Sequence, residues 1–171
     1  MRHWPGAAVI AGITAVAALA AAVPARAAPP VATVKAKIVK PLTLRWVQNL
    51  DLGTVVLGPG TWSGATIGIS RDGVFSCSNA NVTCTGATQA ATYNVTGTRD
   101  QVVRITAPSV TLVNQDDPTQ TLTMTVDSPG TVIIPNSGNR GLDFSLGGAI
   151  TVNSSTAGGL YSGTFNVTVD Y

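Results

Sequence analysis

Hydrophobic and polar residues alternate along the last stretch of the chain, residues 158–171. From residue 161 onward the odd positions are apolar or aromatic except for Gly163, and the even positions are polar. An alternation with a period of two over about ten residues predicts a β-strand with one buried and one solvent-facing side. Gly158 and Gly159, just before it, predict the turn that leads into this strand. The backbone of this strand needs hydrogen-bond partners on both edges, and the sequence does not identify the partner of the second edge.

A second alternating segment lies near the start of the chain, at residues 31–38. One face carries Ala32, Val34, Ala36 and Ile38, and the other carries Thr33, Lys35 and Lys37. We therefore expect an N-terminal strand here. Pro41 should interrupt it, because proline donates no hydrogen bond to a sheet. The alternation then resumes with Leu42, Leu44 and Trp46, which predict a further strand.

Short strands separated by turn signals are predicted for the rest of the chain, and no segment after residue 27 has helical periodicity. The Asp-Gly pair in residues 71–74 is typical of a hairpin turn. Many short strands at roughly ten-residue spacing predict an all-β protein, an antiparallel sandwich or barrel. The expected strands are residues 50–57, 66–70, 91–96, 101–106, 110–113, 121–126, 132–134, 142–146 and 149–152.

Residues 1–27 have the features of a secretory signal peptide. A weakly basic start precedes an uncharged apolar run at residues 6–23, and Ala25-x-Ala27 resembles a cleavage site. The alternative is an uncleaved membrane anchor, for which this run is near the lower length limit. We expect export to the periplasm, cell surface or medium, with no membrane span after cleavage. The expected organisation is a signal peptide at 1–27, an N-terminal arm at 28–41 and one β-sandwich domain at 42–171.

Charge is balanced once the expected signal peptide is set aside. Without Arg2 and Arg26, eight basic residues face eight acidic ones, so nothing resembles the basic surface of a nucleic-acid-binding protein. The distribution is uneven, because four of the basic residues precede the first acidic residue, Asp51. The N-terminal part of the mature chain is therefore positive, and the part from Asp51 onward is mildly negative.

Catalysis is not expected. The only histidine is His3, inside the expected signal peptide, and the chain has no glutamate, so the commonest general base is missing. We expect no catalytic residues, no cofactor and no metal ligands. Asn114, Asp116 and Asp117 could offer oxygens to calcium, but such ions need six or more, and these residue types favour a turn.

Two further groups have a structural and a functional interpretation. Trp46, Trp62, Tyr93 and Tyr161 could stack on a sugar, but this number of aromatics is normal for a core, and Trp46 lies on the apolar side of its strand. Core packing is therefore favoured. Cys77 and Cys84 are expected to form a disulfide in an exported chain. Their spacing lacks the features of a redox pair, so the bridge should be structural.

Several segments resemble an uncharacterised family of small exported proteobacterial proteins that carries a domain-of-unknown-function label. These segments are residues 50–55, 93–97, 148–152 and 159–171. This family is similar in turn to the spore coat U and archaic chaperone–usher pilins. Such pilins end in an alternating strand with an aromatic near its end, and have a glycine near the fourteenth position from the end, where Gly158 stands. Here the aromatic Tyr171 is last rather than penultimate, and Cys77 and Cys84 do not lie near the first strand.

The resemblance implies an immunoglobulin-like (pilin-like) antiparallel β-sandwich that lacks its final strand. A periplasmic chaperone would fill the gap first, and the arm of the next subunit would fill it in a fibre, which is β-strand addition. The expected function is a non-enzymatic subunit of a secreted surface fibre, with copies of itself, a chaperone and an outer-membrane usher as partners. The donor residues would be Ala32, Val34, Ala36 and Ile38. The acceptor residues would be Tyr161, Phe165, Val167, Val169 and Tyr171. The alternative is a monomeric module, for carbohydrate for example, closed by its own N-terminal strand.

Overall fold

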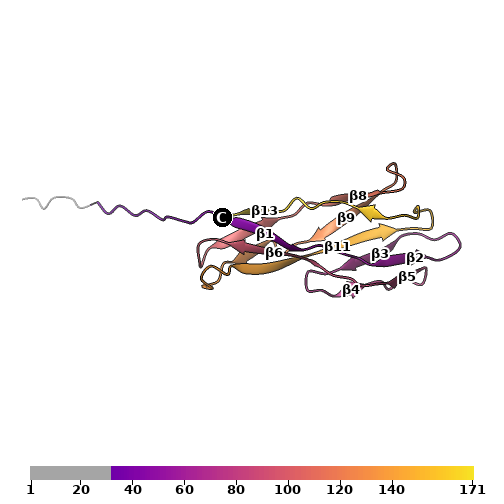
Figure 1. Cartoon of the computed structure of the whole chain (residues 1–171), viewed down its shortest axis with the longest axis horizontal. Coiled ribbons are helices and arrows are strands. Elements are labelled where there is room, and N and C mark those ends of the chain that lie inside the picture. The colour runs from indigo at the N-terminus through magenta and orange to yellow at the C-terminus, as the bar shows by residue number, and fades with distance from the viewer. Residues whose placement is uncertain (1–31) are drawn as a thin grey trace, which may run out of the picture. The chain divides into compact units, whose positions relative to one another are not determined.

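A computed structural model describes residues 32–171, and all regular secondary structure in that range is β (Figure 1). No helix that could cross a membrane occurs among these residues. The expected signal peptide lies outside the described residues. The strands are β1 (Thr43–Gln48), β2 (Thr54–Leu57), β3 (Ala65–Ile69), β4 (Phe75–Ser76), β5 (Val82–Thr85), β6 (Ala91–Thr96), β7 (Val102–Thr106), β8 (Val110–Asn114), β9 (Thr121–Asp127), β10 (Thr131–Ile133), β11 (Leu142–Val152), β12 (Tyr161–Ser162) and β13 (Thr168–Asp170).

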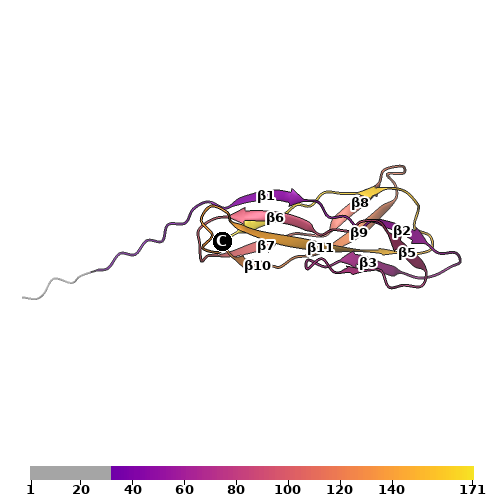
Figure 2. The same ribbon diagram turned by 60° about the horizontal axis from the view of Figure 1, so that its bottom comes forward.

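Residues 37–171 form one compact unit, and the described residues before it, 32–36, belong to a separate one. Within the compact unit every strand pair is antiparallel. The largest sheet has the order β1-β6-β11-β9-β8-β12, with β3 and β4 attached through β11. Two smaller sheets, β10-β7-β13 and β2-β5, complete the fold. Figure 2 shows β11 running along the length of this unit, next to β6 for its first half and β9 for its second.

Two clusters of buried apolar side chains fill the sandwich. One is centred on Ile67, Met124 and Ile150, and the other on Val95 and Leu146. Full burial of one such side chain contributes about 1.5–3 kcal/mol. The alternating burial of β7 and β8 matches the period-two pattern of their sequences. The predicted all-β antiparallel β-sandwich is confirmed.

A single strand, β11, replaces the two strands predicted at 142–146 and 149–152. The glycines between them do not break it. A Cβ at Gly147 would lie 2.3 Å from the Ile69 carbonyl oxygen, and one at Gly148 would lie 2.9 Å from Met124 Sδ. These glycines therefore allow neighbouring groups to approach the backbone closely, which is another common use of glycine in a strand.

The continuous last strand predicted from residue 161 onward is wrong. Only its two ends pair: β12 pairs with β8, and β13 pairs with β7. The segment passes from one sheet to another, so residues 163–167 join no ladder. The burial pattern survives nevertheless, since Phe165, Val167 and Val169 are half-buried and their neighbours are exposed.

The predicted N-terminal strand is also absent from the described part of the chain. Residues 32–42 form no strand, and Val31 lies outside the described residues. The next predicted strand is confirmed as β1. Its Trp46, however, is 58% exposed, so the expectation that Trp46 belongs to the core is wrong. The register of β1 on β6 shifts between Trp46 and Gln48, and Trp46 lines an open cavity.

Cys77 and Cys84 form the expected disulfide. Cys77 follows β4, which pairs with β3, and Cys84 lies in β5, which pairs with β2. The bridge therefore joins two sheets rather than tightening a hairpin. The predicted Asp-Gly turn is confirmed nearby, where the Ser70 amide donates to the Val74 carbonyl at 2.9 Å.

Candidate functional site

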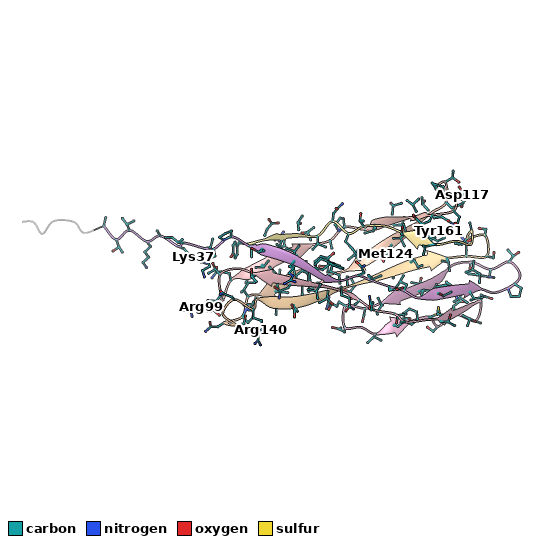
Figure 3. All side chains as sticks on the ribbon, viewed as in Figure 1. Lys37, Arg99, Asp117, Met124, Arg140 and Tyr161 are labelled. Atoms are coloured by element: carbon teal, nitrogen blue, oxygen red, sulfur yellow. A yellow bond between two sulfur atoms is a disulfide. The ribbon has the colours of Figure 1, made fainter. Side chains whose placement is uncertain are left out.

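A cavity of about 980 Å³ opens onto the first apolar cluster. Two extended stretches wall it, residues 46–57 and residues 156–165. Its floor consists of core side chains from the sheet behind, among them Leu112, Met124 and Ile150. Figure 3 labels Met124 on the floor and Tyr161 on one wall. The core of the sandwich is thus incompletely covered along one side.

The first wall runs from the end of β1 to β2. It presents Trp46, Leu50, Leu52, Val55 and Leu57 to the cavity. In the described part of the chain β1 pairs only with β6, and β2 pairs only with β5, so each strand has one edge without a neighbour. Two backbone hydrogen bonds hold the stretch between β1 and β2. The Asp51 amide donates to the Gln89 carbonyl at 2.8 Å, and the Gln89 amide donates to the Asp51 carbonyl at 2.9 Å. The sequence predicted a strand over residues 50–57, of which only Thr54–Leu57 forms one, and it gave no indication that this stretch walls a cavity.

The second wall is the C-terminal segment, where Tyr161 and Phe165 line the cavity. Of the predicted acceptor residues, Val167 and Val169 instead pack against the other core cluster, and Tyr171 is exposed. Gly163 fits closely over β8, because a Cβ there would lie 2.7 Å from the Thr111 carbonyl oxygen. Of the five predicted acceptor residues, two therefore line the cavity and three do not.

Asn114 anchors the start of this second wall. Its side chain is buried, with 1% exposure. Nδ2 donates to the Gly158 carbonyl at 3.0 Å, and Oδ1 accepts from the amides of Asp116 at 2.9 Å and Asp117 at 3.3 Å. The predicted turn is therefore confirmed. The role of Asn114 at Gly158 was missed, because nothing local in the sequence links positions so far apart.

Asp117 closes the same turn. Its Oδ1 accepts from the Thr119 hydroxyl at 2.7 Å and from the Thr119 amide at 3.1 Å. These two bonds, the hydroxyl first, hold the pKa of the Asp117 carboxyl below its usual value. No cluster of three or more metal-ligating side chains occurs in residues 32–171.

Three of the four candidate stacking aromatics line the cavity: Trp46, Tyr93 and Tyr161. Tyr93 stacks on Phe144 with ring centroids 5.8 Å apart, and burial raises the pKa of its phenol. The Tyr161 hydroxyl donates to the Ala157 carbonyl at 2.9 Å. Trp62 instead packs against the first core cluster, and its Nε1 donates to the Gly58 carbonyl at 3.2 Å.

The root of the arm is held at the opposite end of the C-terminal segment. The Tyr171 hydroxyl donates to the Lys40 carbonyl at 2.6 Å and accepts from the Thr98 amide at 2.8 Å. The Lys40 amide donates to Thr98 Oγ1 at 2.6 Å, and Lys37 Nζ donates to Gln101 Oε1. Figure 1 accordingly shows the end of the chain beside the start of β1. None of these residues lines the cavity.

The predicted donor residues are exposed. Val34 and Ile38 each have 91% of their surface accessible, and Ala32 and Ala36 are also exposed. Residues 32–38 therefore carry alternating apolar side chains that are exposed and belong to no sheet.

The fold and the cavity define a small antiparallel β-sandwich with an incompletely covered core. A family model matches residues 42–171, and the chain belongs to that family, which is described as Domain of unknown function (DUF4402). No curated protein and no solved structure matches the chain.

Proposed function

We propose that the protein is a non-enzymatic structural subunit of a secreted surface fibre that assembles by donor-strand addition. The observation that carries this proposal is the cavity itself. It exposes the core between two walls whose backbones, among the described residues, lack a strand partner on one edge or more. Such edges invite an extended segment from another chain. The resemblance to spore coat U and archaic chaperone–usher pilins agrees with this interpretation.

The proposed donor is the arm of a second copy. Its alternating residues Ala32, Val34, Ala36 and Ile38 would fill the cavity, and its polar residues would face solvent. Eight extended residues span about 26 Å, a normal strand length. The arm and the cavity are different surfaces, so this contact is head to tail and generates an open filament. Before assembly a periplasmic chaperone would cover the cavity, and an outer-membrane usher would export the subunit.

Self-completion by the same molecule's arm is less favoured. The arm would have to turn back just before β1, where contacts with Thr98 and Tyr171 hold Lys40. Insertion into its own cavity would break these contacts. Insertion into a neighbour keeps them.

The test compares Val34→Asp and Ile38→Asp with Thr33→Asp, a matched control on the other face of the arm. Each of the first two puts an unpaired charge into an apolar groove, which is costly, whereas the control leaves its charge in solvent. We expect fibres in surface-sheared material, and ladders on unboiled denaturing gels, from the parent and the control only. Equal assembly of all variants would show that this arm is not the donor.

The second candidate function is a monomeric binding module for carbohydrate. The presence of Trp46, Tyr93 and Tyr161 in one cavity favours it, since amphipathic aromatic rings offer both apolar faces and polar edges. A stable monomeric parent that binds glycans, with binding lost in Trp46→Ala, would replace the fibre proposal.

A further inference from the structure

The cavity has two ends that differ in their surroundings. At one end the β8–β9 turn is bonded directly to the wall: Asn114 donates to the Gly158 carbonyl, and the Gln115 amide donates to the Leu160 carbonyl at 2.8 Å. At the other end lies Phe165, from which the chain continues to β13 and Tyr171. An inserted arm therefore has its root either at the β8–β9 turn or towards Tyr171.

The turn at the first end is acidic. Asp116 and Asp117 are both exposed. The one ion pair among residues 32–171 joins Arg71 and Asp127, so neither carboxylate of the turn has a basic partner within 4.0 Å in this part of the chain. The bonds from Thr119 hold the pKa of the Asp117 carboxyl below its usual value. The turn that carries these charges is bonded to Gly158 and Leu160, which line the cavity.

The root of the arm is basic. Figure 3 shows Lys37, Arg99 and Arg140 at one end of the compact unit and Asp117 at the opposite end. Lys40 belongs to the same region, because its amide bonds Thr98. Three carboxylates lie in this region: Asp100, next in the chain to Arg99; Asp143, which accepts from the Asn94 amide as the Arg140 carbonyl does; and Asp170, which precedes Tyr171 and pairs with Arg104 across β13 and β7. With Arg104 counted, five cations outnumber these three anions.

We propose that the β8–β9 turn of one subunit docks against the basic arm root of the next, with Asp116 and Asp117 facing Lys37 and Arg99 of the second copy. This inference rests on the proposed function, because the inserted arm brings the two ends together. The contact adds charge complementarity to the apolar insertion, and it fixes the direction in which the arm enters the cavity.

Only one direction of insertion is compatible with the charges. If the root of the incoming arm lay towards Tyr171, it would meet the receiving subunit's own Lys40 and Arg99, and like charges in contact repel. If it lies at Gly158, it meets the acidic turn. The incoming arm then runs antiparallel to the receiving C-terminal segment. Such end-to-end complementarity mainly accelerates association.

The test is a charge swap in purified mature protein refolded from denaturant, with assembly followed by light scattering. One variant carries Asp116→Lys and Asp117→Lys, and the other carries Lys37→Glu and Arg99→Glu. At low ionic strength we expect each alone to assemble about tenfold more slowly than the parent. We expect the equimolar mixture to recover the parent rate, because every contact between alternating variants is again between opposite charges.

Asp72→Lys, an exposed reversal in the β3–β4 turn, should leave the rate unchanged. The differences should shrink at about 1 M salt, where charges separated by more than about 3 Å are screened. If the parent assembles and Val34→Asp does not, but the two swap variants match the parent or fail to rescue each other, this docking contact is wrong and the donor-strand proposal stands. A parent that never assembles overturns both.

Discussion

The buried side chain of Asn114 joins the β8–β9 turn to Gly158, forty-four positions away in the sequence. Gly159, next to it, has a φ of 142° and lies so close to Asn114 that a Cβ would be 2.5 Å from both side-chain polar atoms. The two consecutive glycines therefore have distinct uses: Gly158 provides the carbonyl, and Gly159 provides the space. Together with Asn114 they set where the second wall of the cavity begins.

Replacement of Asn114 by alanine should therefore destabilise the protein more than an ordinary surface change. It leaves the Gly158 carbonyl and two turn amides without their partner, and an unsatisfied buried group costs about 1–3 kcal/mol. We expect a loss of that size in the free energy of unfolding in urea. The matched control is Asn139→Ala at an exposed site, which should change it little. Equal effects of the two changes would show that Asn114 is not an anchor.

The alternation of the last segment predicted its burial correctly and its pairing incorrectly. Side-chain burial follows from the local period of two, so Phe165, Val167 and Val169 face inward as expected. Pairing depends on which strands lie alongside, and here β8 and β7 belong to different sheets. The same limitation explains Trp46. Its place in the alternation indicated the core, but within residues 32–171 no strand covers its side of the sandwich. The sequence therefore predicted that a strand partner would be missing beside the last segment, but not which residues would wall the resulting cavity.

Tyr171→Phe should loosen the root of the arm while preserving the ring. The phenol bridges the Lys40 carbonyl and the Thr98 amide, so its loss frees that amide to exchange with solvent. We expect faster hydrogen exchange at Thr98 and a small loss of stability, about 0.5 kcal/mol, because the site is exposed. Tyr161→Phe removes a comparable hydroxyl bond, to Ala157, and is the control. Unchanged exchange at Thr98 in Tyr171→Phe would contradict the bridging role.

The disulfide should stabilise the protein without taking part in any reaction. It closes a short loop, with a sequence separation of 7 residues, for which chain entropy gives about 2.4 kcal/mol. Thiol labelling of the unreduced protein should find no free sulfhydryl, and Cys77→Ala with Cys84→Ala should lower the free energy of unfolding by about this amount. Because the bridge joins the strand pairs β2-β5 and β3-β4, exchange should increase mainly in β2 and β5. Full labelling of both cysteines in the native protein would exclude the bridge.

Thr119 should control the ionisation of Asp117. The folded pKa lies below the unfolded value of 3.8, chiefly because the Thr119 hydroxyl donates to the carboxylate. A lowered pKa stabilises the folded state above the unfolded value, and this contribution is lost as the pH falls through the folded pKa. Thr119→Val removes the hydroxyl but keeps the amide bond, so the pKa should rise part of the way towards 3.8. The parent and the variant should then differ in stability at neutral pH by an amount that disappears in acid. A carboxyl-carbon NMR titration measures the shift, and Thr123→Val, at an exposed position of β9, is the control that should leave it unchanged. An Asp117 pKa equal in Thr119→Val and the parent would show that the hydroxyl does not stabilise the carboxylate.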